Sequence, residues 1–300
     1  MIKIKEVKAM FSFKGQLIVE YSLKVLTGMR IGGSKESFDI GGLDNPVIKT
    51  VISIPNFYIS GKELPAGVPY IPGSSLKGKI RSLLEWANGN VERMIERAMN
   101  DRKTEEKSNK DKDAEKDIVA VAGSPCICGK CDICVLFGTG DVETIKKLKL
   151  EDQPGPPRLI FYDAYPTEET LEKLEEELGP RIYTEIKTEN HINRITSKAT
   201  PRKVERVPAG AVFEGKIVFR LFKDEDKQKL GILFNGMKLL EDNFLGGYGS
   251  RGSGRVKFEN IKLTFRSKNY YLGKGEVSSL GDGEFKSLEE LNIQELANRL

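Results

Sequence analysis

The chain has 300 residues, 39% of them hydrophobic and 31% charged, which is enough apolar material for one large domain or two. The formal net charge of +4 excludes a histone-like polycation, so any surface that binds nucleic acid must be local. No stretch approaches about 18 apolar residues and no apolar signal segment is present, so we expect a cytoplasmic protein with no membrane partner.

The predicted elements alternate between strands and helices along the chain. Alternating apolar residues predict a strand over 17–25, and apolar residues at helical spacing predict a helix over 74–87, capped by Ser74 or Ser75. The other expected elements, in chain order, are a strand at 1–8, a helix at 91–99, a charged mobile loop at 101–117, a strand at 159–162, a helix at 167–178, strands at 181–187 and 213–221, a helix at 230–237, a strand at 256–265 bulged near Glu259-Asn260, and a C-terminal helix opened by a capping box at Ser287-x-x-Glu290.

Without the insertions, the order of elements is strand, helix, strand, strand, helix, strand. This is the ferredoxin-like βαββαβ order that RNA-recognition domains share. We therefore expect an α+β protein with a ferredoxin-like/RRM-like core and large insertions. The core would occupy about 15–88, 158–163 and 211–266, interrupted by insertions at 90–157 and 164–210 and followed by an extension at 267–300 with a helix.

All four cysteines lie in one short segment with the spacing Cys126-x-Cys128-x-x-Cys131-x-x-Cys134. A disulfide framework would distribute its cysteines along the chain, so this cluster indicates a metal site. Four thiolates suit a structural Zn²⁺ ion in a closed tetrahedral site. Part of an iron–sulfur motif and a set of reduced thiols without metal are the alternatives.

The helix that begins near Ser74 is a candidate phosphate-binding element. The N-terminus of a helix offers free N–H groups to an anion, and Lys77 and Arg81 lie four residues apart on one face. An ordinary capped helix with solvated lysines is the alternative.

A glycine-rich segment, 246–254, has five glycines in nine residues, with Tyr248 and Arg251 among them. Such a backbone can follow a phosphate chain closely, while Arg251 pairs with phosphate and Tyr248 stacks on a base. A flexible hairpin loop is the alternative.

A basic stripe over 191–207 contains five cations and a single acid, Glu205. The cations are Arg194, Lys198, Arg202, Lys203 and Arg206. Such a stripe suits counterion release on RNA, and the interleaved Ile192 and Ile195 could insert between bases. A solvated charged face is the alternative.

Asp44 lies in a loop bounded by glycines and a proline, within the segment 40–46. A carboxylate there could approach a scissile phosphate or hold a divalent ion. Aspartate is also common in turns because it bonds its own backbone. His191, the single histidine, is more typical of a surface or stacking residue than of a catalyst, and a two-histidine nuclease site is excluded within one chain.

Taken together, these segments resemble the backbone-forming RAMP subunit of type III-A (Csm) CRISPR effector complexes. The similarity covers about 15–265 and rests on an ordered set of motifs at 27–33, 40–49, 71–81, 136–138, 158–164, 184–187, 193–196, 201–202 and 245–252.

The resemblance implies one RAMP domain over 1–300, with insertions that form a lid, a Cys-rich zinc loop and a thumb-like hairpin at about 185–210. Several copies would assemble as a filament along a crRNA guide, together with other Csm subunits, and the thumb would kink the duplex of guide and target single-stranded RNA. The residues implied to contact RNA are Arg30, Lys49, Ser74, Ser75, Lys77, Arg81, Arg194, Arg202, Lys203, Gly246, Gly247, Tyr248, Gly249 and Arg251.

The resemblance also implies that Asp44 cleaves the target RNA near each kink with a divalent cation such as Mg²⁺. Arg30 stands where some relatives have histidine, which favours a phosphate contact for Arg30. Two alternatives share the fold: a guide-binding module that does not cleave, and a free-standing guide-processing endoribonuclease that acts without metal.

Overall fold

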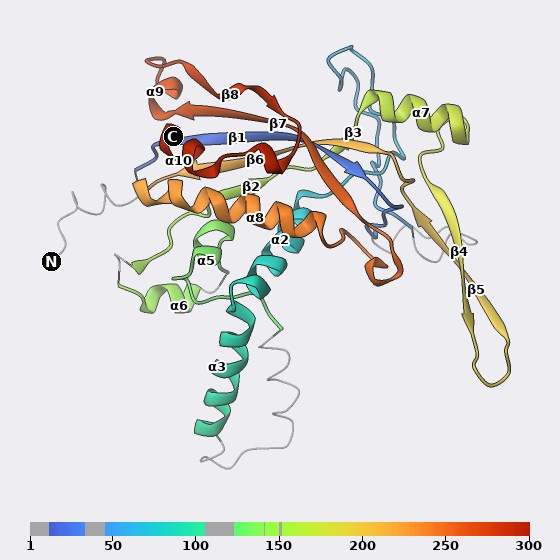
Figure 1. The fold of residues 1–300 in the computed structure, drawn as a ribbon, viewed down its shortest axis with the longest axis horizontal. Coiled ribbons are helices and arrows are strands. Elements are labelled where there is room, and N and C mark those ends of the chain that lie inside the picture. Colours follow the sequence, from blue (N-terminus) through green and yellow to red (C-terminus); the bar gives the residue numbers. More distant parts are fainter. Residues whose placement is uncertain (1–11, 34–45, 106–122, 141, 150–151) are drawn as a thin grey trace.

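A computed structural model describes residues 12–33, 46–105, 123–140, 142–149 and 152–300 (Figure 1). Its centre is a six-stranded sheet in the order β2-β6-β1-β7-β8, with β3 also paired to β6. The strands are β1 (Gly15–Val25), β2 (Leu159–Phe161), β3 (Tyr165–Pro166), β6 (Val212–Leu221), β7 (Val256–Ser267) and β8 (Val277–Phe285).

The predicted α+β, ferredoxin-like class is confirmed. The six predicted core elements are β1, α2 (Gly73–Ala87), β2, β6, α8 (Leu230–Glu241) and β7, and their strands follow the order β2-β6-β1-β7 with antiparallel neighbours. The predicted bulge is also present, because the β1–β7 register shifts between Glu20 and Ser22, opposite Asn260.

The core lies between the sheet and two helices, α2 and α8, which cover one of its faces (Figure 1). The predicted stripe of α2 is buried there, including Leu76, Ile80 and Leu84. Gly236 of α8 allows the two helices to approach closely, because a Cβ at this position would lie 2.6 Å from Cγ2 of Ile80. The alternating apolar residues of β1 complete this core from the sheet side.

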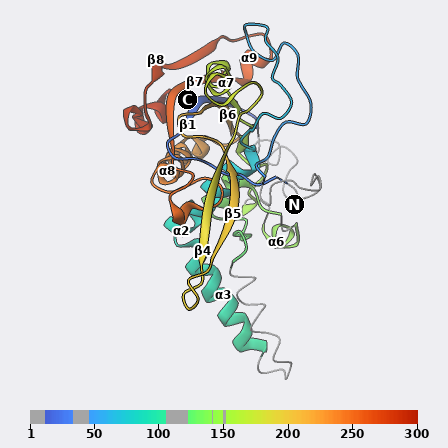
Figure 2. The same ribbon diagram turned by 90° about the vertical axis from the view of Figure 1, so that its right-hand side faces the viewer.

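The insertions carry their own elements. After α2 come α3 (Asn90–Glu105), α5 (Asp132–Phe137) and α6 (Val142–Lys147); α7 (Glu168–Leu178) precedes a two-stranded hairpin of β4 (Glu185–Ile192) and β5 (Ala199–Arg206). Shorter elements are the 3₁₀ helices η4 (Asp224–Lys229), η5 (Gly249–Arg251) and η6 (Leu288–Glu290) and the helices α9 (Lys268–Tyr271) and α10 (Ile293–Arg299). Both α3 and the hairpin extend away from the body of the molecule (Figures 1 and 2). None of the described helices has the length and apolar character needed to span a bilayer.

Several predicted ends were wrong. Neither Ser74 nor Ser75 caps α2, which begins at Gly73 after Pro72. The C-terminal helix begins at Ile293 with Asn292 as its cap, because Ser287 precedes and Glu290 ends a short 3₁₀ turn instead.

Other predictions were displaced or lie elsewhere. The strand expected at 181–187 begins only at Glu185, and β8 was not predicted at all. Residues 101–105 belong to α3, whereas the rest of the charged loop and the strand at 1–8 lie outside the described residues.

One buried ion pair connects the edge of the sheet to the turn before α8. Nε of Arg158 lies 3.0 Å from Oδ2 of Asp226, and both side chains are 1% exposed. The backbone N–H groups of Phe222 and Lys223 donate to the same oxygen at 2.9 Å. A buried charge requires such complete pairing, so this contact fixes η4 against β2.

Replacing Asp226 by alanine is expected to lower the free energy of unfolding by about 3–5 kcal/mol, because Arg158 would remain buried without its partner. Urea-induced unfolding measures the effect. Asp224→Ala is the matched control, since Asp224 lies in the same turn with a 76% exposed side chain paired to Lys14, and its effect on stability should be much smaller. Equal losses in the two variants would contradict the role of the buried pair.

Candidate nucleic-acid interface

The glycine-rich segment packs directly on the backbone that follows β1. Gly247 N–H donates to the carbonyl oxygen of Arg30 at 2.8 Å. Gly246 has φ +83°, and a Cβ at this position would lie 2.1 Å from the same oxygen. Only glycine fits this contact, so the predicted glycine signal marks a close backbone approach.

Tyr248 lies between two cations. The guanidinium carbons of Arg30 and Arg251 lie 5.5 Å and 5.6 Å from its ring centroid. These distances are typical of cation–π contacts. The structure thus brings together three of the predicted RNA-binding residues, of which Arg30 is far from the other two in the sequence.

Arg251 also connects this segment to the hairpin. Its Nη1 lies 3.0 Å from Oε2 of Glu189 on β4, and Nζ of Lys187 lies 3.2 Å from Oε1 of the same residue. The hydrogen bond from Lys187 holds the pKa of Glu189 below its usual value; burial opposes this effect, and the hydrogen bond from Arg251 adds to it. Glu189 was not among the predicted site residues, because an acid in a basic region gave no signal of its own.

The hairpin presents the predicted basic stripe to solvent. Arg194, Arg202 and Lys203 are all exposed, as are two large apolar side chains, Ile192 and Ile195, the latter 94% exposed. At the tip, Oδ1 of Asn193 accepts hydrogen bonds from the N–H groups of Ile195 and Thr196. The tip therefore combines positive charge with apolar side chains that nothing in the described part of the chain covers.

Glu205 at the base of the hairpin is buried, unlike the exposed Arg194, Arg202 and Lys203. It accepts hydrogen bonds from Nζ of Lys49 at 2.5 Å, from Oγ1 of Thr184 at 2.7 Å and from the N–H of Val47 at 2.9 Å. Burial raises the pKa of Glu205, but these hydrogen bonds outweigh it and hold that pKa below its ordinary value. Lys49, predicted to contact RNA, thus also stabilises the base of the hairpin.

Asp44 lies outside the described residues. The ends of its segment are described: Gly33 N–H donates to the carbonyl oxygen of Pro46 at 3.3 Å, and Gly32 bridges to Val47. Val47 is the residue bonded to Glu205. Both ends of the Asp44 segment therefore start from the base of the hairpin.

The residues of α2 that were predicted to bind RNA fall into two groups: Ser74, Ser75 and Lys77 lie near its start, whereas Arg81 packs on the cysteine segment. Gly73 N–H already donates to Oδ1 of Asp163 at 2.7 Å, while Ser74 is exposed and Ser75 is half-buried. Burial, followed by the nearby Arg81 and Arg220, lowers the pKa of Lys77.

Arg81 faces the cysteine segment instead. Its guanidinium donates to Glu85, to the carbonyl of Gly138 at 3.0 Å and to the carbonyl of Cys126 at 2.7 Å. Lys79, which was not predicted, lies with Nζ 3.8 Å from the ring centroid of Phe244, just before the glycine-rich segment.

The four cysteine sulfurs converge within 4.8 Å of one another. Sγ of Cys126 lies 3.9 Å from Sγ of Cys131, and Sγ of Cys128 lies 3.8 Å from Sγ of Cys134. A tetrahedral ion with metal–sulfur bonds of about 2.3 Å would separate its ligands by about 3.8 Å. The donor set and its spacing fit a metal ion, as the sequence predicted.

An RRM-like sheet with a basic hairpin and a glycine-rich segment at one end is the architecture of a nucleic-acid-binding protein class. The chain belongs to the RAMP superfamily, whose match spans residues 22–257, and within it to the Csm3 family. The resemblance inferred from the sequence is thereby confirmed.

Two curated relatives carry the name CRISPR system Cms endoribonuclease Csm3. The chain is 37% identical to the protein of Methanothermobacter thermautotrophicus over 291 residues (93% of this chain, 98% of the relative) and 39% identical to that of Methanocaldococcus jannaschii over 286 residues (94% of each). A solved structure, the Csm3–Csm4 subcomplex in the type III-A CRISPR-Cas interference complex, matches with a TM-score of 0.53 and 29% identity, covering 96% of this chain and 98% of that one.

Glu205→Gln is expected to destabilise the protein by about 2 kcal/mol at neutral pH, because the charge-assisted bonds to Lys49 and Thr184 are weakened. Since the pKa of Glu205 is lowered by folding, its contribution is complete above about pH 4.5 and is lost as the pH falls through the folded-state pKa. Urea unfolding of both proteins across this range measures the difference. Exposed Glu176→Gln is the control, and a wild-type advantage that stays constant at acidic pH would contradict the assignment.

Proposed function

We propose that this chain is a crRNA-binding backbone subunit of a type III-A CRISPR interference complex and cleaves guide-paired target RNA. The observation that supports this most directly is the cluster formed by Arg30, Tyr248 and Arg251, tied through Glu189 to an exposed basic hairpin. The names of the relatives, endoribonucleases of CRISPR systems, point to the same activity.

In this proposal, the guide backbone follows the glycine-rich segment. Gly247 and its neighbours admit phosphates closely, Arg30 and Arg251 supply charge, and Tyr248 offers a ring for a base. Lys77 and Ser74 extend the contact along the start of α2. None of these contacts reads base edges in a fixed pattern, which suits a protein that must hold guides of any sequence.

The hairpin would separate bases of the paired strands. Arg194, Arg202 and Lys203 would bind phosphates on either side, while Ile195 enters the gap between neighbouring bases. Repetition of this contact by further copies of the chain would give a filament along the guide. The other partners would be Csm subunits, in keeping with the Csm3–Csm4 subcomplex.

Cleavage would proceed by attack of the target's own 2′-hydroxyl on the adjacent phosphate. This would form a 2′,3′-cyclic phosphate and break the bond from phosphorus to the 5′-oxygen, which would leave as a hydroxyl after gaining a proton from water. The Asp44 carboxylate would accept the hydroxyl proton or help to hold a divalent cation such as Mg²⁺, which supplies electrostatic stabilisation of the transition state. Distortion of the strand by the hairpin would bring the hydroxyl in line with the bond to be broken.

The cysteine segment would hold structural Zn²⁺ through all four thiolates. The backbone N–H groups of Cys131 and Cys134 donate to the sulfurs of Cys128 and Cys131, which suits thiolate ligands. Arg81 anchors this segment to α2, so the ion would stabilise the fold at a distance from the reaction.

Asp44→Ala is expected to lower the rate of cleavage by roughly 100-fold or more without weakening RNA binding. The assay assembles the protein on a guide and follows a labelled complementary RNA in Mg²⁺ and in EDTA, with Asp39→Ala as a matched loop control. Regularly spaced cuts that require metal and Asp44 would support the proposal. Cleavage by the mutant would move the catalyst elsewhere, cleavage in EDTA would favour a guide-processing enzyme, and binding without cleavage by the wild type would indicate a holding module.

Purified protein is expected to contain about one zinc ion per chain, detected by elemental analysis, without the visible absorption of an iron–sulfur cluster. Cys128→Ser should lose the ion and lower the thermal midpoint, while the adjacent, exposed Ile127→Ala should keep both. Stoichiometric iron, or full stability without any metal, would overturn the zinc assignment.

A further inference from the structure

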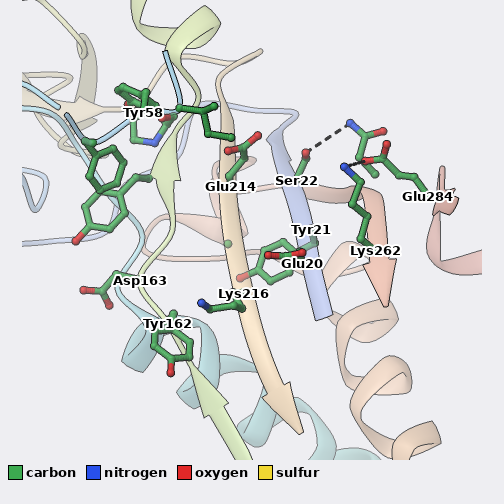
Figure 3. A pocket seen from close by; sticks show the side chains of 16 residues that line it. Glu20, Tyr21, Ser22, Tyr58, Tyr162, Asp163, Glu214, Lys216, Lys262 and Glu284 are labelled. Carbon is green, nitrogen blue, oxygen red and sulfur yellow. Dashed lines mark hydrogen bonds and ion pairs between the residues drawn. The ribbon is translucent and has the colours of Figure 1, made fainter. Parts of the chain in front are cut away.

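A second candidate binding site lies on the sheet face opposite α2 and α8. It is a pocket of about 540 Å³ over β1, β6, β7 and β8, bordered by residues 57–59 and 162–166 (Figure 3). Side chains alternate along each strand, so Glu20 and Glu214 face this pocket while Val19 and Phe213 enter the core.

The charges of the pocket are mainly negative. Four carboxylates line it, from Glu20, Asp163, Glu214 and Glu284, against two ammonium groups. Both lysines already have contacts: Nζ of Lys262 lies 3.9 Å from Oε1 of Glu284, and Nζ of Lys216 lies 4.6 Å from the ring centroid of Tyr162. This balance is opposite to that of the basic hairpin and repels phosphate.

Aromatic side chains form one wall of the pocket. The ring of Phe57 lies 5.1 Å from those of Tyr58 and Tyr165, in edge-on contacts with both. Burial, followed by the charges of Glu168 and Glu214, raises the pKa of Tyr58 to about 12. Rings beside carboxylates are the surroundings in which proteins bind organic cations.

Tyr21 lies beneath the pocket. By the same alternation its side chain enters the core with Val19, where its ring contacts Phe258 and lies over Gly215. The side chains that the strands present to the pocket are therefore the charged ones of Glu20 and Glu214.

The segment that leads to the aromatic wall exposes apolar side chains. Val51, Ile52 and Ile59 are 91%, 70% and 110% exposed, and Ile59 lines the pocket itself. Exposed apolar side chains are typical of protein-binding surfaces. A free small cation would leave them in water, whereas a polypeptide could cover them.

We propose that this acidic pocket binds an arginine or lysine side chain presented by a basic segment of a partner protein. The cation would pair with Glu20 and Glu214 and contact the aromatic wall, and the flanking residues of the partner would cover the apolar surface. In RNA-recognition domains, the same sheet face stacks bases on aromatic residues of its strands. Here those strands present carboxylates, so the face is suited to a protein and the chain keeps RNA on its other surface.

The test uses the full chain and a fluorescein-labelled peptide in which arginine alternates with alanine, followed by fluorescence anisotropy. Glu20→Gln combined with Glu214→Gln should weaken binding roughly tenfold or more, because two charge-assisted contacts are lost. The exposed Glu177→Gln on α7 is the matched control and should bind like wild type. Both pocket glutamates are exposed, so the double variant should keep its thermal midpoint.

A peptide with citrulline in place of arginine should not bind. Equal binding by the double variant, or by the citrulline peptide, would overturn the proposal. So would displacement of the arginine peptide by single-stranded RNA whose own binding depends on Glu20 and Glu214. Because the pocket shares no residue with the basic interface, these outcomes are independent of guide binding and of Asp44.

Discussion

The pairing of β1 with strands on both of its edges is the constraint on which the interface depends. In this antiparallel register, Lys24 lies opposite Val212 of β6, and Val25 lies opposite Val256 of β7. The end of β1 therefore meets the beginnings of β6 and β7. The chain that leaves β1, the hairpin that precedes β6 and the glycine-rich segment that precedes β7 must then emerge at one end of the sheet.

This arrangement explains why residues from distant parts of the sequence form one surface. Met29 bridges to Val207 just beyond the sheet, and Gly254 N–H donates to the carbonyl of Gly28 at 3.1 Å. The glycines allow three backbones to meet where side chains would collide. Two acids pair with the cations of this surface. Glu205 binds Lys49 at the base of the hairpin, and Glu189 links the hairpin to Arg251.

Much of the fold could be predicted because it depends on local patterns in the sequence. The alternation in β1 and β6 and the stripe of α2 identified the core elements, and their order identified the fold. Strand β8 gave no such pattern, since Gly281 and Gly283 interrupt it with positive φ values and it forms only by pairing with β7. The motifs also located the interface, but not its internal contacts. The contacts of Arg81 with residues 45 and 57 positions away, and that of Lys79 with Phe244, depend on tertiary packing that no local pattern reports.

The hairpin has a mechanical consequence. A two-stranded ribbon has little stability of its own, and this one is tied to the body through Glu205 at its base and through Glu189 midway along β4. The hairpin is therefore most restrained where it joins the body and least restrained at its tip, near Ile195. Ordering a flexible tip upon binding costs conformational entropy, and this cost lowers its affinity for any one sequence. The same compliance lets one tip adapt to many different neighbours along a polymer.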